Sequence, residues 1–252
     1  MSIFNKNIYL QAKLFHLKDL VWALRFHFLK YLIFWPIDLC FLIISLFVNP
    51  YRYNRKYLLK KGIRGAKEVY AYGETPLKTF AQIAHEAGLT SQDSFLELGS
   101  GRGRGAFWLY SLIGCQVTGI EQMGFFVRIN KLMLRLFSYS FPFSLSFLAN
   151  KKQTQKKKRL SFIQGDYLAL EKPFKEATVI YLYGTNLEED FLRKLIQKFK
   201  LLNSMTFKTK TKTKIITISY ALSEYDRSFK TQKEWEVVFP WGKTTAYLNF
   251  LK

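Results

Sequence analysis

The stretch SFLELGSGRGRG, residues 94–105, passes from an apolar run into a loop with glycine at every second position. The first five residues have the length and apolar character of a buried strand. Residues 106–113 follow with a helical pattern. Glycines in a turn between a strand and a helix let the backbone approach a ligand closely, and the helix offers free N–H groups. The stretch therefore predicts a ligand-binding turn.

Helical and strand patterns alternate on both sides of this turn. Helices are expected at residues 76–87, at 106–113, after Glu121 through about residue 137, and at 187–200; strands are expected at 94–98, 116–120, 160–163, 178–182 and 215–219. Residues 235–239 and 245–250 predict a closing hairpin around Pro240, Trp241 and Gly242. This order predicts an α/β fold, a Rossmann-like, doubly wound, mostly parallel sheet of seven strands with an antiparallel C-terminal hairpin.

The first fifty residues differ from the rest of the chain. Residues 31–48 are apolar apart from Asp38 and also contain Pro36, and apolar residues recur upstream at helical spacing. A bilayer span needs roughly 17–25 residues, and an aspartate near its centre costs on the order of 2.5–3.5 kcal/mol. The basic residues that follow at once, from Arg52 to Arg64, favour a membrane anchor with residues 51–252 in the cytoplasm. A buried helical hairpin is the alternative.

We accordingly divide the chain into a helical, membrane-anchoring segment at residues 1–67, with its basic run, and an α/β domain at 68–252. Within the domain, residues 138–159 combine an apolar loop with a block of lysines, and we interpret them as an insertion.

The net charge of +21 is concentrated in three runs, at residues 51–67, 151–159 and 208–214. Seven, six and four basic residues lie there without an acid, which leaves +4 for the remainder. A basic face over the whole fold is therefore excluded, and a nucleic-acid partner is not favoured. Two cysteines exclude a disulfide framework, and three scattered histidines predict neither a metal site nor a catalytic triad.

Acidic residues at the ends of three predicted strands indicate which ligand the turn accepts. Glu97 precedes Gly99 by two residues, where a carboxylate would repel a pyrophosphate but suits the sulfonium and ammonium groups of S-adenosylmethionine. Glu121 ends the second strand and does not discriminate, whereas Asp166 after the third suits the adenine of S-adenosylmethionine. Residues 101–106, GRGRGA, also fit the dinucleotide pattern. A nucleotide-dependent oxidoreductase thus remains the alternative.

Glu97 to Gly103, Glu121 in VTGIEQ and Asp166 in IQGDYL resemble the successive motifs of class I, seven-strand, S-adenosylmethionine-dependent methyltransferases. The resemblance covers about residues 70–252. It implies that the cofactor lies over the loop residues Gly99, Ser100, Gly101 and Gly103, with Glu97 at its methionine end, Glu121 on its ribose, and Asp166 with Tyr167 on its adenine. We predict that Arg102 and Arg104 pair with acids.

A narrower resemblance lies upstream, where VYAYGETP, residues 69–76, is similar to the YGET segment of the non-SET histone-lysine methyltransferases. The resemblance implies that Glu74 and Thr75 fold over the cofactor. The apolar anchor and the GSGxGR loop also resemble the membrane-associated lysine methyltransferases that act on mitochondrial membrane proteins. Residues 181–186, YLYGTN, replace the paired asparagines of the histone-directed group, which leaves the substrate open.

Methyl transfer needs alignment and a dry channel more than acid–base catalysis. We expect Tyr72 and Tyr183 to line this channel as catalytic residues, and Tyr181 to belong to the core. The sequence thus predicts a membrane-tethered methyltransferase that acts on protein lysine. The alternatives are a methyltransferase for a lipid or small membrane-borne molecule, an NAD(P)-dependent oxidoreductase, and a non-enzymatic scaffold.

Overall fold

The computed structural model describes residues 3–26, 28–60, 73–140, 160–184, 187–205 and 212–252. The helices are α1 (Ile3–Phe26), α2 (Phe28–Phe47), α3 (Pro50–Lys60), α4 (Leu77–Glu86), α5 (Arg104–Trp108), the π-helical turn η1 (Leu109–Ile113), α6 (Gly124–Ser140), α8 (Lys172–Glu176), α9 (Glu189–Met205) and α10 (Leu222–Tyr225). The strands are β1 (Ser94–Leu98), β2 (Gln116–Glu121), β3 (Leu160–Gln164), β4 (Val179–Leu182), β5 (Lys214–Ile218), β6 (Phe229–Phe239) and β7 (Gly242–Leu251).

The seven strands form a single sheet in the order β3-β2-β1-β4-β5-β7-β6. The first five in this order pair in parallel, and β7 pairs antiparallel with both β5 and β6. The predicted α/β architecture and its antiparallel closing hairpin are confirmed. Strand β1 lies between β2 and β4 in the sheet, so the direction in which the chain adds strands reverses at β1. Ligands of such sheets bind at the carboxyl ends of the strands that flank this reversal.

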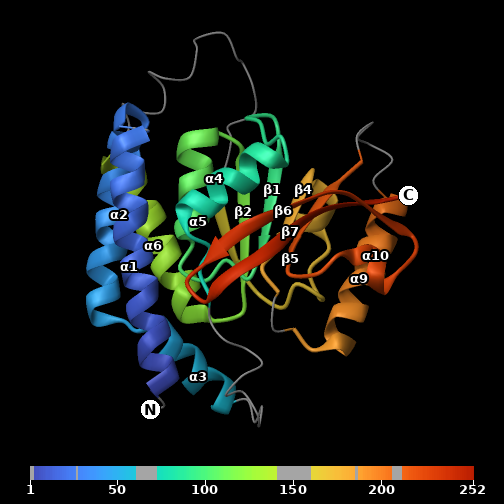
Figure 1. The fold of residues 1–252 in the computed structure, drawn as a ribbon, viewed down its shortest axis with the longest axis horizontal. Helices are drawn as coiled ribbons and strands as arrows, with labels where there is room; N and C mark the ends of the chain where they lie inside the picture. Colours follow the sequence, from blue (N-terminus) through green and yellow to red (C-terminus); the bar gives the residue numbers. More distant parts are fainter. Residues whose placement is uncertain (1–2, 27, 61–72, 141–159, 185–186, 206–211) are drawn as a thin grey trace.

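Helices cover both faces of the sheet (Figure 1). On one face, side chains of α2, α4, α5 and α6 pack with those of β1 and β2 in one apolar cluster. On the other face, α8 and α9 pack against β1, β4 and β5 in a second cluster. Alternate residues of β1 belong to the two clusters, because successive side chains of a strand point to opposite faces.

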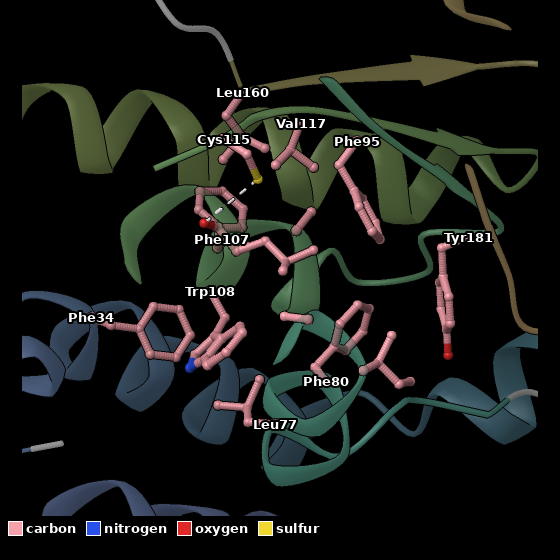
Figure 2. Packing of buried hydrophobic residues seen from close by; sticks show 14 of the residues in the cluster. Phe34, Leu77, Phe80, Phe95, Phe107, Trp108, Cys115, Val117, Leu160 and Tyr181 are labelled. Carbon is pink, nitrogen blue, oxygen red and sulfur yellow. Dashed lines mark hydrogen bonds between the residues drawn. The ribbon is translucent and has the colours of Figure 1, made fainter. Parts of the chain in front are cut away.

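Aromatic rings fill the first cluster, as Figure 2 shows. The ring of Phe80 on α4 lies 5.0 Å from that of Tyr181 and 6.3 Å from that of Phe95, measured between centroids. Phe107 on α5 lies 5.5 Å from Phe162. Tyr181 is only 1% exposed, which confirms its predicted place in the core. This packing fixes α4 and α5 on the sheet, at the two ends of the segment that carries the glycine loop.

The N-terminal helices α1 and α2 form a hairpin (Figure 1), in which α1 packs against α4, and α2 packs against α5 and η1. No helix in the described part of the chain is by itself both long and apolar enough to cross a bilayer. Residues Phe34–Phe47 and Pro50–Tyr57 together meet the length and composition of a span, but their axes are bent by 62°. The inner face of the hairpin belongs to the protein core, where Tyr31, Phe34 and Phe41 are fully buried.

Several element boundaries differ from those that the sequence predicts. Strand β6 begins at Phe229, six residues before the predicted start, because the polar residues there gain a partner in β7. Helix α6 runs to Ser140 and so includes the first residues of the predicted insertion at 138–159, while residues 141–159 lie outside the described residues. The predicted domain boundary at residues 67 and 68 also lies outside them.

Candidate active site

The carboxyl ends of β1, β2 and β3 carry the three predicted acidic residues along one edge of the sheet. Glu97 and Glu121 are each 7% exposed, whereas Asp166 is exposed and accepts a hydrogen bond from the backbone N–H of Leu168 at 2.8 Å. Tyr167, next to Asp166, is buried in the second apolar cluster. The sheet order thus brings Glu97 and Asp166 to the same edge of the sheet, although they are 69 positions apart in the sequence.

Glu97 has the electrostatics of a cation-binding group. Its Oε2 atom is buried without a hydrogen-bond partner among the described residues. Burial, reinforced by the negative charges of Glu121 and Glu74, raises the pKa of Glu97 to about 8. A buried carboxylate without a partner is costly, and a cationic ligand would remove that cost. Glu97 is therefore poised to bind positive charge.

Backbone contacts hold the glycine loop against the sheet. The N–H of Gly101 donates to Glu121 Oε2 at 2.8 Å, and Met123 N–H donates to Oε1 at 2.9 Å. Burial raises the pKa of Glu121, although these backbone donors oppose the rise. On the other side of the loop, Nδ2 of the fully buried Asn130 on α6 donates to the carbonyl of Gly101 at 2.9 Å. Sequence reasoning missed Asn130, whose only signal was an amide among the apolar residues of a helix.

Gly99, Gly101 and Gly103 of the loop all have left-handed backbone conformations, and the first and last of them have different surroundings. Gly99, with φ of +80°, is exposed, and a Cβ atom there would meet nothing within 4 Å. Gly103, with φ of +73°, packs so closely that a Cβ would lie 2.7 Å from the Phe162 ring and 3.0 Å from Asn130. Gly99 thus leaves space for a ligand, and Gly103 fixes the start of α5.

We expect Gly103→Ala to lower the free energy of unfolding by about 2–4 kcal/mol, because it adds a steric clash to the left-handed strain. The control is Gly88→Ala, which has φ of +58° but no neighbour closer than 4.0 Å; it should cost only about 1–2 kcal/mol. Urea unfolding of both variants measures the difference. Equal losses would show that Phe162 and Asn130 yield freely to the added methyl group.

The two loop arginines pair with acids, as predicted. Arg102 donates to both carboxylate oxygens of Glu74, at 2.5 Å from Nε and 2.7 Å from Nη2. Arg104 donates from Nη1 to Asp19 at 2.9 Å and from Nε to Asp38 at 2.6 Å. Both arginines are buried, and their charges are matched within the protein. This arrangement opposes a phosphate-binding role for the loop.

The segment before α4 lies beside the loop, as the YGET resemblance implies. Glu74 is the partner of Arg102, and Thr75 Oγ1 lies 2.7 Å from the hydroxyl oxygen of Tyr181, with which it shares a hydrogen bond. The structure thus brings Glu74 and Thr75 to the carboxyl ends of β1 and β4. Direct contact of Glu74 and Thr75 with the cofactor stays a prediction.

Tyr183, at the end of β4, belongs to an aromatic cluster with the tip of the final hairpin. Its ring lies 5.1 Å from that of Phe239, and its hydroxyl accepts a hydrogen bond from Nε1 of Trp241 at 2.7 Å. Gly73 packs so tightly on Tyr183 that a Cβ there would lie 2.4 Å from the ring. Trp241 was missed because 58 residues separate it from Tyr183. Tyr72, the other predicted catalytic residue, lies outside the described residues.

The fold, the acidic strand ends and the glycine loop define a class I, S-adenosylmethionine-dependent methyltransferase. The family described as "Histone methylation protein DOT1" matches residues 54–239, and the chain belongs to this family. No individually curated protein matches the chain.

Solved structures share this fold at low sequence identity. TrmN from Thermus thermophilus has 12% identity and a TM-score of 0.51, with 75% of this chain and 51% of TrmN covered. The [4+2]-cyclase SpnF has 14% identity and a TM-score of 0.51, with 70% and 81% covered. An RNA methyltransferase from Salinibacter ruber, bound to S-adenosylhomocysteine, has 18% identity and a TM-score of 0.48, with 71% and 92% covered. These likenesses concern the fold alone.

The cofactor of this methyltransferase is S-adenosylmethionine, and two observations show that the site suits it. Glu97 supplies a buried carboxylate without a partner, and Gly99 leaves open space above the turn. The residues predicted to hold the cofactor remain Glu74, Thr75, Glu97, Gly99, Ser100, Gly101, Gly103, Glu121, Asp166 and Tyr167. When bound, the cofactor supplies a methyl group on a positively charged sulfur.

Proposed function

We propose that this enzyme transfers methyl groups to the side-chain amines of protein lysines. The observation that carries the proposal is the match of residues 54–239 to a family described by histone methylation. Glu74 and Thr75 of the YGET segment, which lie beside the glycine loop, support it. A lysine amine must lose its proton and its water before it attacks the methyl group, so the acceptor channel must be narrow and poorly hydrated.

The aromatic cluster of Tyr183, Phe239 and Trp241 supplies walls of this kind. The rings of Phe239 and Trp241 stack at 5.4 Å, with 12° between their planes, and Trp241 is 42% exposed. An exposed tryptophan ring of this kind attracts the ammonium of an approaching lysine through cation–π interaction. In this proposal, the cluster guides the amine and excludes water, and the hydrogen bond from Trp241 fixes the Tyr183 ring.

The test is to incubate the full-length chain with membrane and soluble cell fractions and a cofactor labelled in its methyl group. Hydrolysis of the labelled protein should release methylated lysine. Tyr183→Phe, which loses the hydroxyl held by Trp241, should reduce the rate. Tyr110→Phe is the control, because Tyr110 lies on η1 and packs on Phe137. Label only in arginine or glutamine would overturn the lysine proposal, and label in lipid would favour the alternative acceptor.

We propose further that the N-terminal hairpin attaches the enzyme to a membrane, with the rest of the chain in the cytoplasm. Large apolar side chains are exposed at helical spacing on α1 and also on α2; they are Leu10, Leu14, Leu17, Val21, Leu24, Trp35, Leu39, Ile43, Leu46 and Phe47. The basic helix α3 follows directly. An apolar helix face flanked by basic residues is typical of a helix that lies in the interface of an anionic bilayer.

The hairpin proposal predicts that Leu17→Glu combined with Val21→Glu abolishes flotation of the enzyme with phosphatidylserine-containing vesicles. Each leucine or valine contributes about 1.5–3 kcal/mol when fully buried, so two charges in their place should weaken binding more than tenfold. Leu201→Glu is the control, because Leu201 is 66% exposed on α9, on the other face of the sheet. Unchanged flotation of the double variant would contradict the proposal.

A further inference from the structure

The matched family segment begins at residue 54 and excludes the N-terminal hairpin of α1 and α2. The hairpin nevertheless reaches the glycine loop. Asp19 on α1 and Asp38 on α2, 3% and 2% exposed, provide both carboxylates that bind Arg104. The backbone carbonyl of Phe41 on α2 also accepts a hydrogen bond from Arg102 Nη1 at 3.5 Å. Three acceptors of the two loop arginines thus come from a segment outside the family match.

Asp19 also contacts the first turn of α4, the helix that follows Glu74 and Thr75. Its Oδ2 accepts the backbone N–H of Leu77 at 2.8 Å, and its Oδ1 accepts that of Lys78 at 3.1 Å. These are free donors at the first turn of α4, whose N-cap residue Pro76 provides no side-chain hydrogen bond. Helix α4 directly follows Glu74 and Thr75. One carboxylate therefore ties the segment over the cofactor site to the arginine at the end of the glycine loop.

Further polar contacts hold Asp38 in place inside the hairpin. His16 Nε2 lies 2.8 Å from Asp38 Oδ1, and the Tyr31 hydroxyl donates to Oδ2 at 2.5 Å. The rings of Phe41 and Phe107 lie 5.7 Å apart and close the same interface. In the sequence, His16 carries no signal of a role, and Asp38 lies within an apolar stretch. The structure instead places both residues in a buried polar network against α5.

We propose that the hairpin is an integral part of the cofactor site and that Asp19 and Asp38 are its positioning residues. Arg104 begins α5 immediately after Gly103, so the carboxylates fix the path of the loop on which the cofactor lies. Asp19 fixes the Glu74 and Thr75 segment relative to the same loop. The inference concerns cofactor binding and does not depend on lysine as the acceptor.

The experiment measures S-adenosylhomocysteine binding by calorimetry on the full-length chain and its Asp19→Asn and Asp38→Asn variants, which keep the shape and lose the charge. We expect the dissociation constant to rise about tenfold or more at temperatures where the variants are folded. Phe34→Leu is the control, because Phe34 is an apolar residue of the same interface, near Trp108 (Figure 2). It should lower the melting temperature while leaving the dissociation constant within about twofold.

A double variant, Asp38→Asn with Arg104→Gln, tests whether the carboxylate acts through the arginine. We expect the double variant to bind S-adenosylhomocysteine no more weakly than the weaker-binding of the two single variants, Asp38→Asn and Arg104→Gln. If Asp19→Asn and Asp38→Asn are destabilised like Phe34→Leu but bind S-adenosylhomocysteine like the unmodified chain, the network is only structural and the proposal fails.

If the variants do not fold, hydrogen exchange on the unmodified chain tests whether the hairpin is part of the cofactor site. S-adenosylhomocysteine should slow exchange of amides in the glycine loop and also in the hairpin around Asp19 and Asp38. Protection confined to the loop would overturn the proposal. Failure of lysine methylation would leave this result unchanged, so the two proposals can be tested separately.

Discussion

Replacing Arg104 by methionine is expected to lower the free energy of unfolding by about 3–5 kcal/mol, because two buried carboxylates lose their shared cation. Burial by itself lowers the pKa of Arg104, but Asp38 and Asp19 outweigh it and raise the pKa above its usual range. The arginine is thus charged and strongly bound. Methionine keeps most of the buried volume, so the loss is electrostatic. Small domains are stable by only about 5–15 kcal/mol.

Chemical denaturation of the full chain measures this loss, and Arg193→Met is the matched control. Arg193 bonds Glu189 one helical turn away at 2.5 Å, with the two side chains 57% and 65% exposed. An exposed pair of this kind contributes about 0.3–0.5 kcal/mol. If both variants unfolded at the same denaturant concentration, the buried ion pairs of Arg104 would contribute no more to stability than an exposed pair.

The second large effect should be on the pH dependence of protein stability, which Glu97→Gln is expected to remove. The pKa of Glu97 in the folded protein is about 8, above the usual value of 4.5. A group whose pKa is raised by folding stabilises the protein while it is protonated, and this contribution is lost as the pH rises toward 8. In the absence of cofactor, we expect stability to fall by about 1.4 kcal/mol per pH unit between pH 4.5 and 8 because of this group. Glutamine should remove that slope.

Cofactor binding should show the opposite trend. The ionised form of Glu97 binds the cation, so the dissociation constant should fall about tenfold for each pH unit between pH 6 and 8. Glu97→Gln should bind about 10–100-fold more weakly at pH 8, with little dependence on pH, because a charged hydrogen bond is lost. Calorimetry with S-adenosylhomocysteine, which keeps the ammonium group, measures both. Identical pH profiles of the two proteins would exclude Glu97 from the cofactor site.

Most strands and the glycine turn could be predicted because their signals are local. An apolar run of five residues that ends in alternating glycines specifies a strand and a tight turn with no information from elsewhere in the chain. Polar strand residues gave no such signal: Lys230 and Thr231 of β6 are extended because β7 offers them hydrogen-bond partners. The start of that strand was therefore placed too late.

The contacts around the site depend on residues far apart in sequence. Asp38 and Arg104 are separated by 66 positions, and Asp19 and Arg104 by 85. Judged by its neighbours alone, Asp38 is an isolated charge in an apolar helix, and Asp19 is one of several charged residues along α1. Asn130 is a similar case, since its role became visible only when α6 was placed against the carbonyl of Gly101.

The sequence by itself determined the α/β class, the glycine turn and the acidic strand ends, because each depends on residues that are close together along the chain. Only the tertiary structure decided that the N-terminal helices contact both arginines of the glycine loop. A buried arginine requires carboxylates from somewhere in the chain, and the packing of α1 and α2 on α5 brought Asp19 and Asp38 to it.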